Sequence, residues 1–158
     1  MENRIERNRC SARTATRLMV IDASVWVAAF LARDTHHDDA AALLRRLVEE
    51  GITVATPLLA LAEVAGAIAR QTDDPELAEK ITGFLHTQPW IQFVPLTDDL
   101  AIAAATIAAR HRLRGADAVY VALAAQRSLN LITLDREMRE RTKKTVASAT
   151  PTAWLKQH

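Results

Sequence analysis

Four acidic residues stand alone among apolar or small neighbours in this chain of 158 residues. Each follows a short apolar run or lies in an apolar, helix-like segment, where a carboxylate loses hydration unless a cation meets it. Carboxylates in such surroundings are typical of sites that bind metal ions or transfer protons. The four candidates are Asp22, Glu63, Asp117 and Asp135.

Each acid also has an ordinary structural explanation. Asp22 and Asp135 precede predicted helices, where aspartate often caps the first turn. Asp117 begins an apolar helix, and acids are favoured near helix N-termini. An exposed helix face would explain Glu63. For Asp22 alone, capping and catalysis are equal alternatives, but four isolated acids together favour one shared site.

Carboxylates without accompanying cysteines suit a hard cation, so Mg²⁺ or Mn²⁺ fits this set better than Zn²⁺. His36 and His37 are adjacent, so on a helix they point about 100° apart, and we expect them to be structural or exposed. The sequence has no Gly-x-x-x-x-Gly-Lys or Gly-x-Gly-x-x-Gly motif, so it offers no support for a nucleotide cofactor.

A parallel sheet would bring the acids together. Apolar runs that alternate with helix-like patterns predict such a sheet, because parallel strands need helical crossovers. Thr56 and Pro57 are predicted to cap and begin a helix that reaches about residue 70, and Gly115 is predicted to separate two helices. Asp22 and Asp135 are then expected at the carboxyl edge of the sheet. The predicted strands are 18–22, 52–55, 91–94, 131–134 and a weak one near 145–147. The predicted helices are 24–32, 36–50, 56–70, 75–86, 97–110, 116–128 and 136–141.

Composition predicts a single globular domain at 18–158, preceded by a disordered basic extension at 1–17 that contains five Arg and two Glu. The remainder lacks the strongly basic character of a duplex-DNA binder, and 4% aromatic residues argue against binding single strands by base stacking. No apolar run is long enough for a membrane span. The single Cys10 suits a reducing cytoplasm.

Four short motifs, in this order and spacing, resemble the PIN-domain family, and in particular the VapC-type toxins of bacterial toxin–antitoxin pairs. The resemblance extends from about residue 19 to 149. It implies a three-layer α/β fold, with a five-stranded parallel sheet flanked by helices, and a Mg²⁺- or Mn²⁺-dependent ribonuclease. It also implies a cognate antitoxin partner and usually a homodimer. The motifs lie at 20–24, 62–64, 115–124 and 132–135.

The resemblance also implies roles for particular residues. The four acids would form the acidic metal site. Our hypothesis for the mechanism is that Asp22 and Asp117 are direct ligands and that Glu63 and Asp135 hold bound waters or a second ion. Ser24 and Thr133 would be supporting hydroxyls. The chain departs from the family at Ala62, where Ser or Thr is common, so one supporting hydrogen bond is missing there.

Three arginines close to these acids, Arg112, Arg114 and Arg136, are expected to steer RNA phosphates. Two other functions stay open. The chain is alternatively a catalytically silent PIN-fold module that binds RNA or protein. A phosphatase-like hydrolase with Asp22 as covalent nucleophile is a further alternative, but it needs a second Asp where Ser24 stands.

Overall fold

A computed structural model describes residues 18–158, and the predicted disordered extension at 1–17 lies outside the described residues. Five strands of the described chain form one parallel sheet in the order β3-β2-β1-β4-β5. This confirms the fold class expected from the sequence. The strands are β1 (Leu18–Ile21), β2 (Thr53–Pro57), β3 (Ile91–Val94), β4 (Leu131–Ile132) and β5 (Ser148–Ala149).

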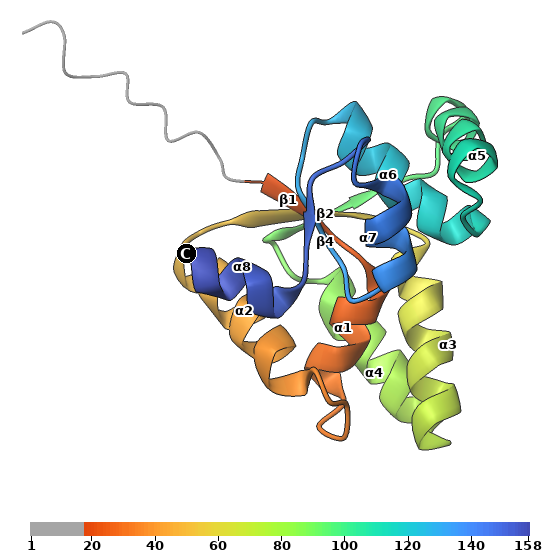
Figure 1. The fold of residues 1–158 in the computed structure, drawn as a ribbon. Helices are drawn as coiled ribbons and strands as arrows, with labels where there is room; N and C mark the ends of the chain where they lie inside the picture. Colours follow the sequence, from red (N-terminus) through yellow and green to blue (C-terminus); the bar gives the residue numbers. More distant parts are fainter. Residues whose placement is uncertain (1–17) are drawn as a thin grey trace, which may run out of the picture.

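Helices lie on both sides of the sheet (Figure 1). Helices α5 and α6 pack on each other on one side, where α6 contacts β1, β2 and β4. On the other side α1 packs against α2 and α3, while α8 packs on α2. The helices are α1 (Ala23–Phe30), α2 (His37–Glu49), α3 (Ala60–Thr72), α4 (Pro75–His86), α5 (Asp98–His111), α6 (Gly115–Gln126), α7 (Arg136–Thr142) and α8 (Pro151–Gln157).

Local sequence explains most helix ends. Helix α2 buries Ala40, Leu43 and Leu47, which share one face at helical spacing, and the chain leaves it through Gly51 at a φ of 65°. Thr97 caps α5 by accepting the Leu100 N–H. None of the helices in residues 18–158 is both long and apolar enough to cross a membrane.

Three predicted assignments were wrong. The weak strand expected near 145–147 is instead β5 at Ser148–Ala149, because residues 143–146 form the turn that follows α7. Thr56 and Pro57 do not begin a helix but end β2, where they pair with β3. The Thr56 hydroxyl donates to the Ile21 carbonyl of β1 at 3.0 Å, so tertiary pairing outweighs the local capping signal. Gly115 does not separate two helices, because it is the first residue of α6.

The strand order creates a switch point beside β1. The chain moves from β1 outward to β2 and β3, then returns to place β4 on the opposite side of β1. In open parallel sheets, ligands bind at the carboxyl edge where the order reverses in this way. Asp22, which follows β1, and Thr133, which follows β4, both lie at this point.

Candidate active site

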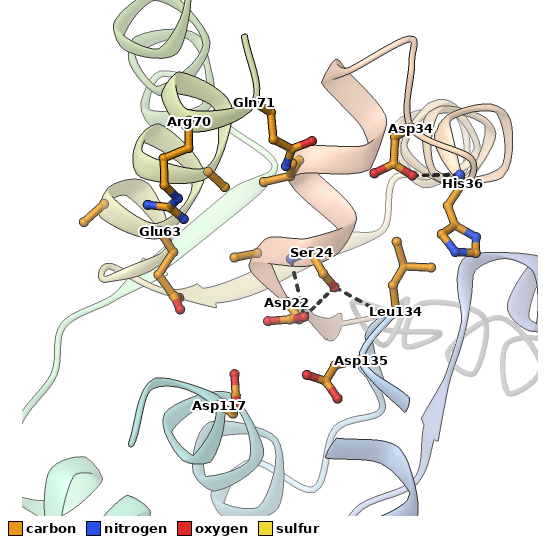
Figure 2. Close-up of a pocket in the computed structure, with 14 residues that line it drawn as sticks. Asp22, Ser24, Asp34, His36, Glu63, Arg70, Gln71, Asp117, Leu134 and Asp135 are labelled. Carbon is orange, nitrogen blue, oxygen red and sulfur yellow. Dashed lines mark hydrogen bonds between the residues drawn. The ribbon is translucent and has the colours of Figure 1, made fainter. Parts of the chain in front are cut away.

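All four predicted acids line one pocket of about 540 Å³ at the carboxyl edge of the sheet. Figure 2 shows their carboxylates directed toward a common space. Asp22 follows β1, Glu63 lies in the first turn of α3, Asp117 in the first turn of α6, and Asp135 precedes α7. Residues spread over more than a hundred positions of the sequence therefore meet because four elements converge on the switch point.

Asp22 is held by neighbours on both of the strands that flank the switch point. The register pairs Ile21 with Ile132, which sets Asp22 beside Thr133. The Thr133 hydroxyl donates to Asp22 Oδ2 at 2.8 Å, and the Ser24 hydroxyl donates to the same oxygen at 2.5 Å. Ser24 Oγ also accepts the Leu134 N–H at 3.1 Å, so it links the two strand ends. Both predicted hydroxyls thus contact the acid that they were expected to support.

Burial dominates the electrostatics of Asp22. Its side chain is only 5% exposed, and this burial raises the pKa of the Asp22 carboxyl above its ordinary value. The hydrogen bonds from Ser24 and Thr133 act in the opposite direction, because they stabilise the charged form. Within residues 18–158 this buried carboxylate has two hydroxyl donors and no basic partner, so it is suited to receiving a cation.

Two of the acids both cap a helix and line the pocket. Asp22 caps α1 through the Ser24 N–H, and Asp135 caps α7 by accepting the Met138 N–H at 2.8 Å. Asp135 also receives support through its own N–H, which donates to Thr133 Oγ1 at 3.0 Å. The cap fixes each carboxylate at the start of a helix, and that position is also the pocket wall.

Glu63 is half-buried and hydrogen-bonded, so its helix face is not simply exposed. The Tyr120 hydroxyl of α6 donates to Glu63 Oε2 at 2.5 Å. Burial raises the pKa of Glu63, the Tyr120 hydrogen bond opposes this, and the negative charges of Asp22 and Asp117 add to the rise. Burial together with the charges of Asp22 and Glu63 also raises the pKa of the Tyr120 phenol, so this residue stays a proton donor.

The negative charges of other acids in the pocket affect the pKa of Asp117. Burial, followed by the charges of Asp22 and Asp135, raises the pKa of Asp117 to about 6, while Arg114 acts in the opposite direction. Each of these acids thus makes ionisation of its neighbours less favourable. A group of carboxylates with this mutual repulsion would be relieved by a positive ion.

The structure adds residues that sequence reasoning missed. Asp34, Arg70 and Gln71 also line the pocket, and Tyr120 contacts it through Glu63. His36, which was expected to be structural or exposed, is exposed and lines the pocket rim as well. Tyr120 carried a usable signal, since it lies three residues after Asp117 on the same helix. The others became visible only in three dimensions, because the α1–α2 connection and the end of α3 approach the sheet edge from elsewhere in the chain.

The three predicted RNA-binding arginines lie apart from the main pocket. Arg112 and Arg114 line a small adjoining cleft of about 30 Å³ that Asp117 and Asp135 share. Arg136 is exposed at the start of α7 and lines neither of these two cavities. The structure therefore brings two of the three close to the acids.

The donor set fits a hard divalent cation in its chemistry, because all four groups are carboxylates whose charges repel one another. Within residues 18–158, however, no three His, Cys, Asp or Glu side chains are grouped as a ready-made metal centre. Sharing one ion would require the carboxylates to move closer together.

Comparison with solved structures shows the same fold in several proteins. VapC20 of Mycobacterium tuberculosis, described as a sarcin–ricin loop cleaving toxin, is 21% identical with a TM-score of 0.66, over 77% of this chain and 93% of that one. FitAcB of Neisseria gonorrhoeae is 20% identical with a TM-score of 0.65, over 85% and 98% of the two chains. A toxin–antitoxin complex from Klebsiella pneumoniae gives 18% identity and a TM-score of 0.61, over 84% and 97%.

The comparison with curated proteins found no match to the sequence. The family model of the PIN domain, in contrast, matches residues 19–144. That range takes in all four acids, most of β1 and all of β2, β3 and β4. The chain therefore belongs to the PIN domain family.

Proposed function

We propose that this protein is a Mg²⁺- or Mn²⁺-dependent ribonuclease and the toxin of a toxin–antitoxin pair. One observation carries the proposal: four carboxylates from four separate elements line a single pocket at the switch point of a PIN fold. Similar folds occur in a sarcin–ricin loop cleaving toxin and in toxin–antitoxin complexes. By the same analogy we propose an antitoxin partner, a homodimer and a cytoplasmic location.

In this proposal Asp22 and Asp117 bind the ion, and Glu63 and Asp135 orient water or hold a second ion. A bound divalent ion supplies polarisation of a phosphoryl oxygen and helps to form a hydroxide nucleophile near neutral pH. Ser24 and Thr133 keep Asp22 in one orientation through Oδ2. Hydrolysis adds the water oxygen to phosphorus as the P–O bond to the departing nucleotide breaks, and the leaving oxygen takes up a proton.

A second function is favoured by one observation. The acids are not grouped as a ready-made metal centre in the described chain, which suits a PIN-fold module that binds RNA or protein without cutting it. RNA cleavage distinguishes the two functions, since a silent module binds its partner without cutting RNA, whether or not an ion is bound at this pocket.

The test combines metal binding with RNA cleavage. Mn²⁺ titration should raise the Tm of the wild-type protein, and the Asp22→Asn/Asp117→Asn double variant should lose that rise. A randomised single-stranded RNA should be cut in Mn²⁺ but not in EDTA. An unchanged metal response in the double variant would overturn the metal site, and a metal response without cleavage would favour the silent module.

A further inference from the structure

One arginine lies among the acids of the pocket. Arg70 is on α3, seven residues after Glu63, so the two residues share a helix face. Figure 2 shows the Arg70 side chain directed back along the helix toward Glu63 and the shared space. Arg70 lines the pocket together with Gln71, so a cation stands at the α3 side of an otherwise acidic site.

Arg70 has no partner within the part of the chain that the structure describes. There, the ion pairs join Arg46 to Glu50 and Arg141 to Glu137, and neither they nor any hydrogen bond involves the Arg70 guanidinium. A guanidinium has five N–H donors in a planar fork that matches a phosphate group. An arginine without a protein partner beside a pocket is therefore available to a phosphate.

Gly66 makes room for the position of this guanidinium. A Cβ atom placed on Gly66 would lie 3.0 Å from Arg70 Nη1, closer than ordinary van der Waals contact. Glycine inside a helix is also less favourable than alanine. Gly66, a poor helix former, thus stands at the position of α3 over which the Arg70 side chain folds back.

A second arginine, Arg114, precedes α6 and lines the small adjoining cleft. This cleft and the pocket that Arg70 lines have Asp117 and Asp135 in common. Successive phosphates of a nucleic-acid strand repeat along its backbone, so a strand crossing the carboxylates would bring phosphates to both cavities.

We propose that Arg70, seated over Gly66, binds an RNA phosphate at the α3 side of the acidic pocket and thereby positions the strand across the carboxylates. This inference rests on the ribonuclease function proposed above. It assigns a substrate-binding role to a residue outside the acidic set and identifies the ligand as a backbone phosphate rather than a base.

The test compares Arg70→Gln with Arg45→Gln, which removes the same charge from an exposed position on α2 outside the pocket lining. Cleavage of a randomised 20-nucleotide RNA in Mn²⁺ gives kcat and KM at several salt concentrations. Arg70→Gln should raise KM about tenfold or more, as for the loss of a charged hydrogen bond. It should also reduce the slope of log KM against log salt by about 0.7, the value for one phosphate contact on a single strand. Arg45→Gln should change neither quantity, and Arg70→Lys should recover part of the salt slope.

Gly66→Ala provides an independent variant that keeps the arginine. The added methyl group must shift the guanidinium by a few tenths of an ångström, so KM should rise, although less than in Arg70→Gln. The Tm should stay level or increase, because alanine favours the helix, and a merely structural defect would lower it. In the double variant the two effects on KM should not add, because the second change acts on a contact that is already lost.

The outcomes separate this inference from the proposed function. If wild-type protein cuts RNA and Arg70→Gln matches Arg45→Gln in KM and salt slope, Arg70 is not a phosphate-binding residue while the ribonuclease function stands. A rise in KM without any change in salt slope would likewise overturn the phosphate contact. If wild-type protein neither binds nor cuts RNA with Mn²⁺ present, the ribonuclease function itself fails, and this inference fails with it.

Discussion

The two walls of the acidic pocket are built in different ways. The strand wall consists of the residues that follow β1 and β4: Asp22, Ser24, Thr133 and Asp135. The helix wall consists of residues from α3 and α6: Glu63, Arg70, Asp117 and Tyr120. Hydrogen bonds connect every member of the strand wall to another member. In the helix wall one hydrogen bond, from Tyr120 to Glu63, joins two members, and Asp117 and Arg70 are placed by packing of their helices.

This difference indicates which part of the site is rigid. Strand register and two helix caps fix the strand wall, so its carboxylates have little freedom. The helix wall can adjust, because among its members a hydrogen bond joins only Tyr120 and Glu63. The movement needed for the acids to share an ion is therefore expected in the helix wall, and removing a supporting group should cost more in the strand wall.

The largest effect is expected at the centre of the strand wall. Asp22→Asn keeps the shape but removes the buried charge, and RNA cleavage should fall by on the order of 10²–10³-fold. Initial cleavage rates in Mn²⁺ measure this effect. The matched control is Asp74→Asn, the same change at the exposed cap of α4, which should leave the rate unaltered. Normal cleavage by the Asp22 variant would show that the strand wall is a structural cap and no more.

The next effect concerns the support of that carboxylate. Thr133→Val removes the donor to Asp22 and the acceptor for the Asp135 N–H while preserving volume. Activity should drop by about 10–100-fold, as for other groups that orient a metal ligand, and urea unfolding should show a loss of about 1–3 kcal/mol. Thr106→Val on the exposed face of α5 serves as the control. An active Thr133 variant would mean that Asp22 needs no orientation.

A smaller effect is expected for the corresponding change in the helix wall. Tyr120→Phe removes the donor to Glu63 Oε2 but retains the buried ring. Since Glu63 can readjust at a half-buried position, the cleavage rate should fall only a few-fold, and stability should decrease by about 1 kcal/mol. Rates measured beside those of Thr133→Val make the comparison direct. A larger loss of cleavage rate in Tyr120→Phe than in Thr133→Val would show that the helix wall, and not the strand wall, is the more rigid of the two.

The smallest effect is a pH dependence of stability in the metal-free protein. Because the pKa of Asp117 is about 6 in the folded protein and its ordinary value is 3.8, the folded state binds more protons between these values. Stability contributed by this group is therefore present below about pH 4 and is lost as pH rises through about 6. Asp117→Asn should be more stable than wild type at pH 7, by less than about 1 kcal/mol given the partial exposure of the side chain.

Urea unfolding in EDTA at pH 7 and pH 4 measures this difference, which should vanish at the lower pH. The control is Asp98→Asn, an acid in the first turn of α5 away from the pocket lining. A stability difference that is the same at both pH values would show that Asp117 does not experience the charges of the strand wall.

The contrast between the walls also explains what the sequence could predict. Asp22 and Asp135 were recognisable because each directly follows an apolar strand, and the parallel fold then requires their convergence. Arg70 and Tyr120 were missed because their places at the pocket depend on where α3 and α6 lie relative to the sheet edge. Thr56 and Pro57 were misassigned for the same reason: a strong local capping pattern gave way to pairing with β3.

The position of β1 at the centre of the sheet has a consequence for folding during synthesis. Asp22 is among the first residues of the described chain, yet its partner Thr133 follows 111 residues later. At ribosomal speeds of about 5–20 residues per second, these residues emerge roughly 6 to 22 s apart. Until then β1 can pair only with β2, and the non-local closure by β4 is the slow kind of folding step. A nascent or C-terminally truncated chain that lacks β4 therefore cannot assemble the pocket, so activity appears only once synthesis of the domain is nearly finished.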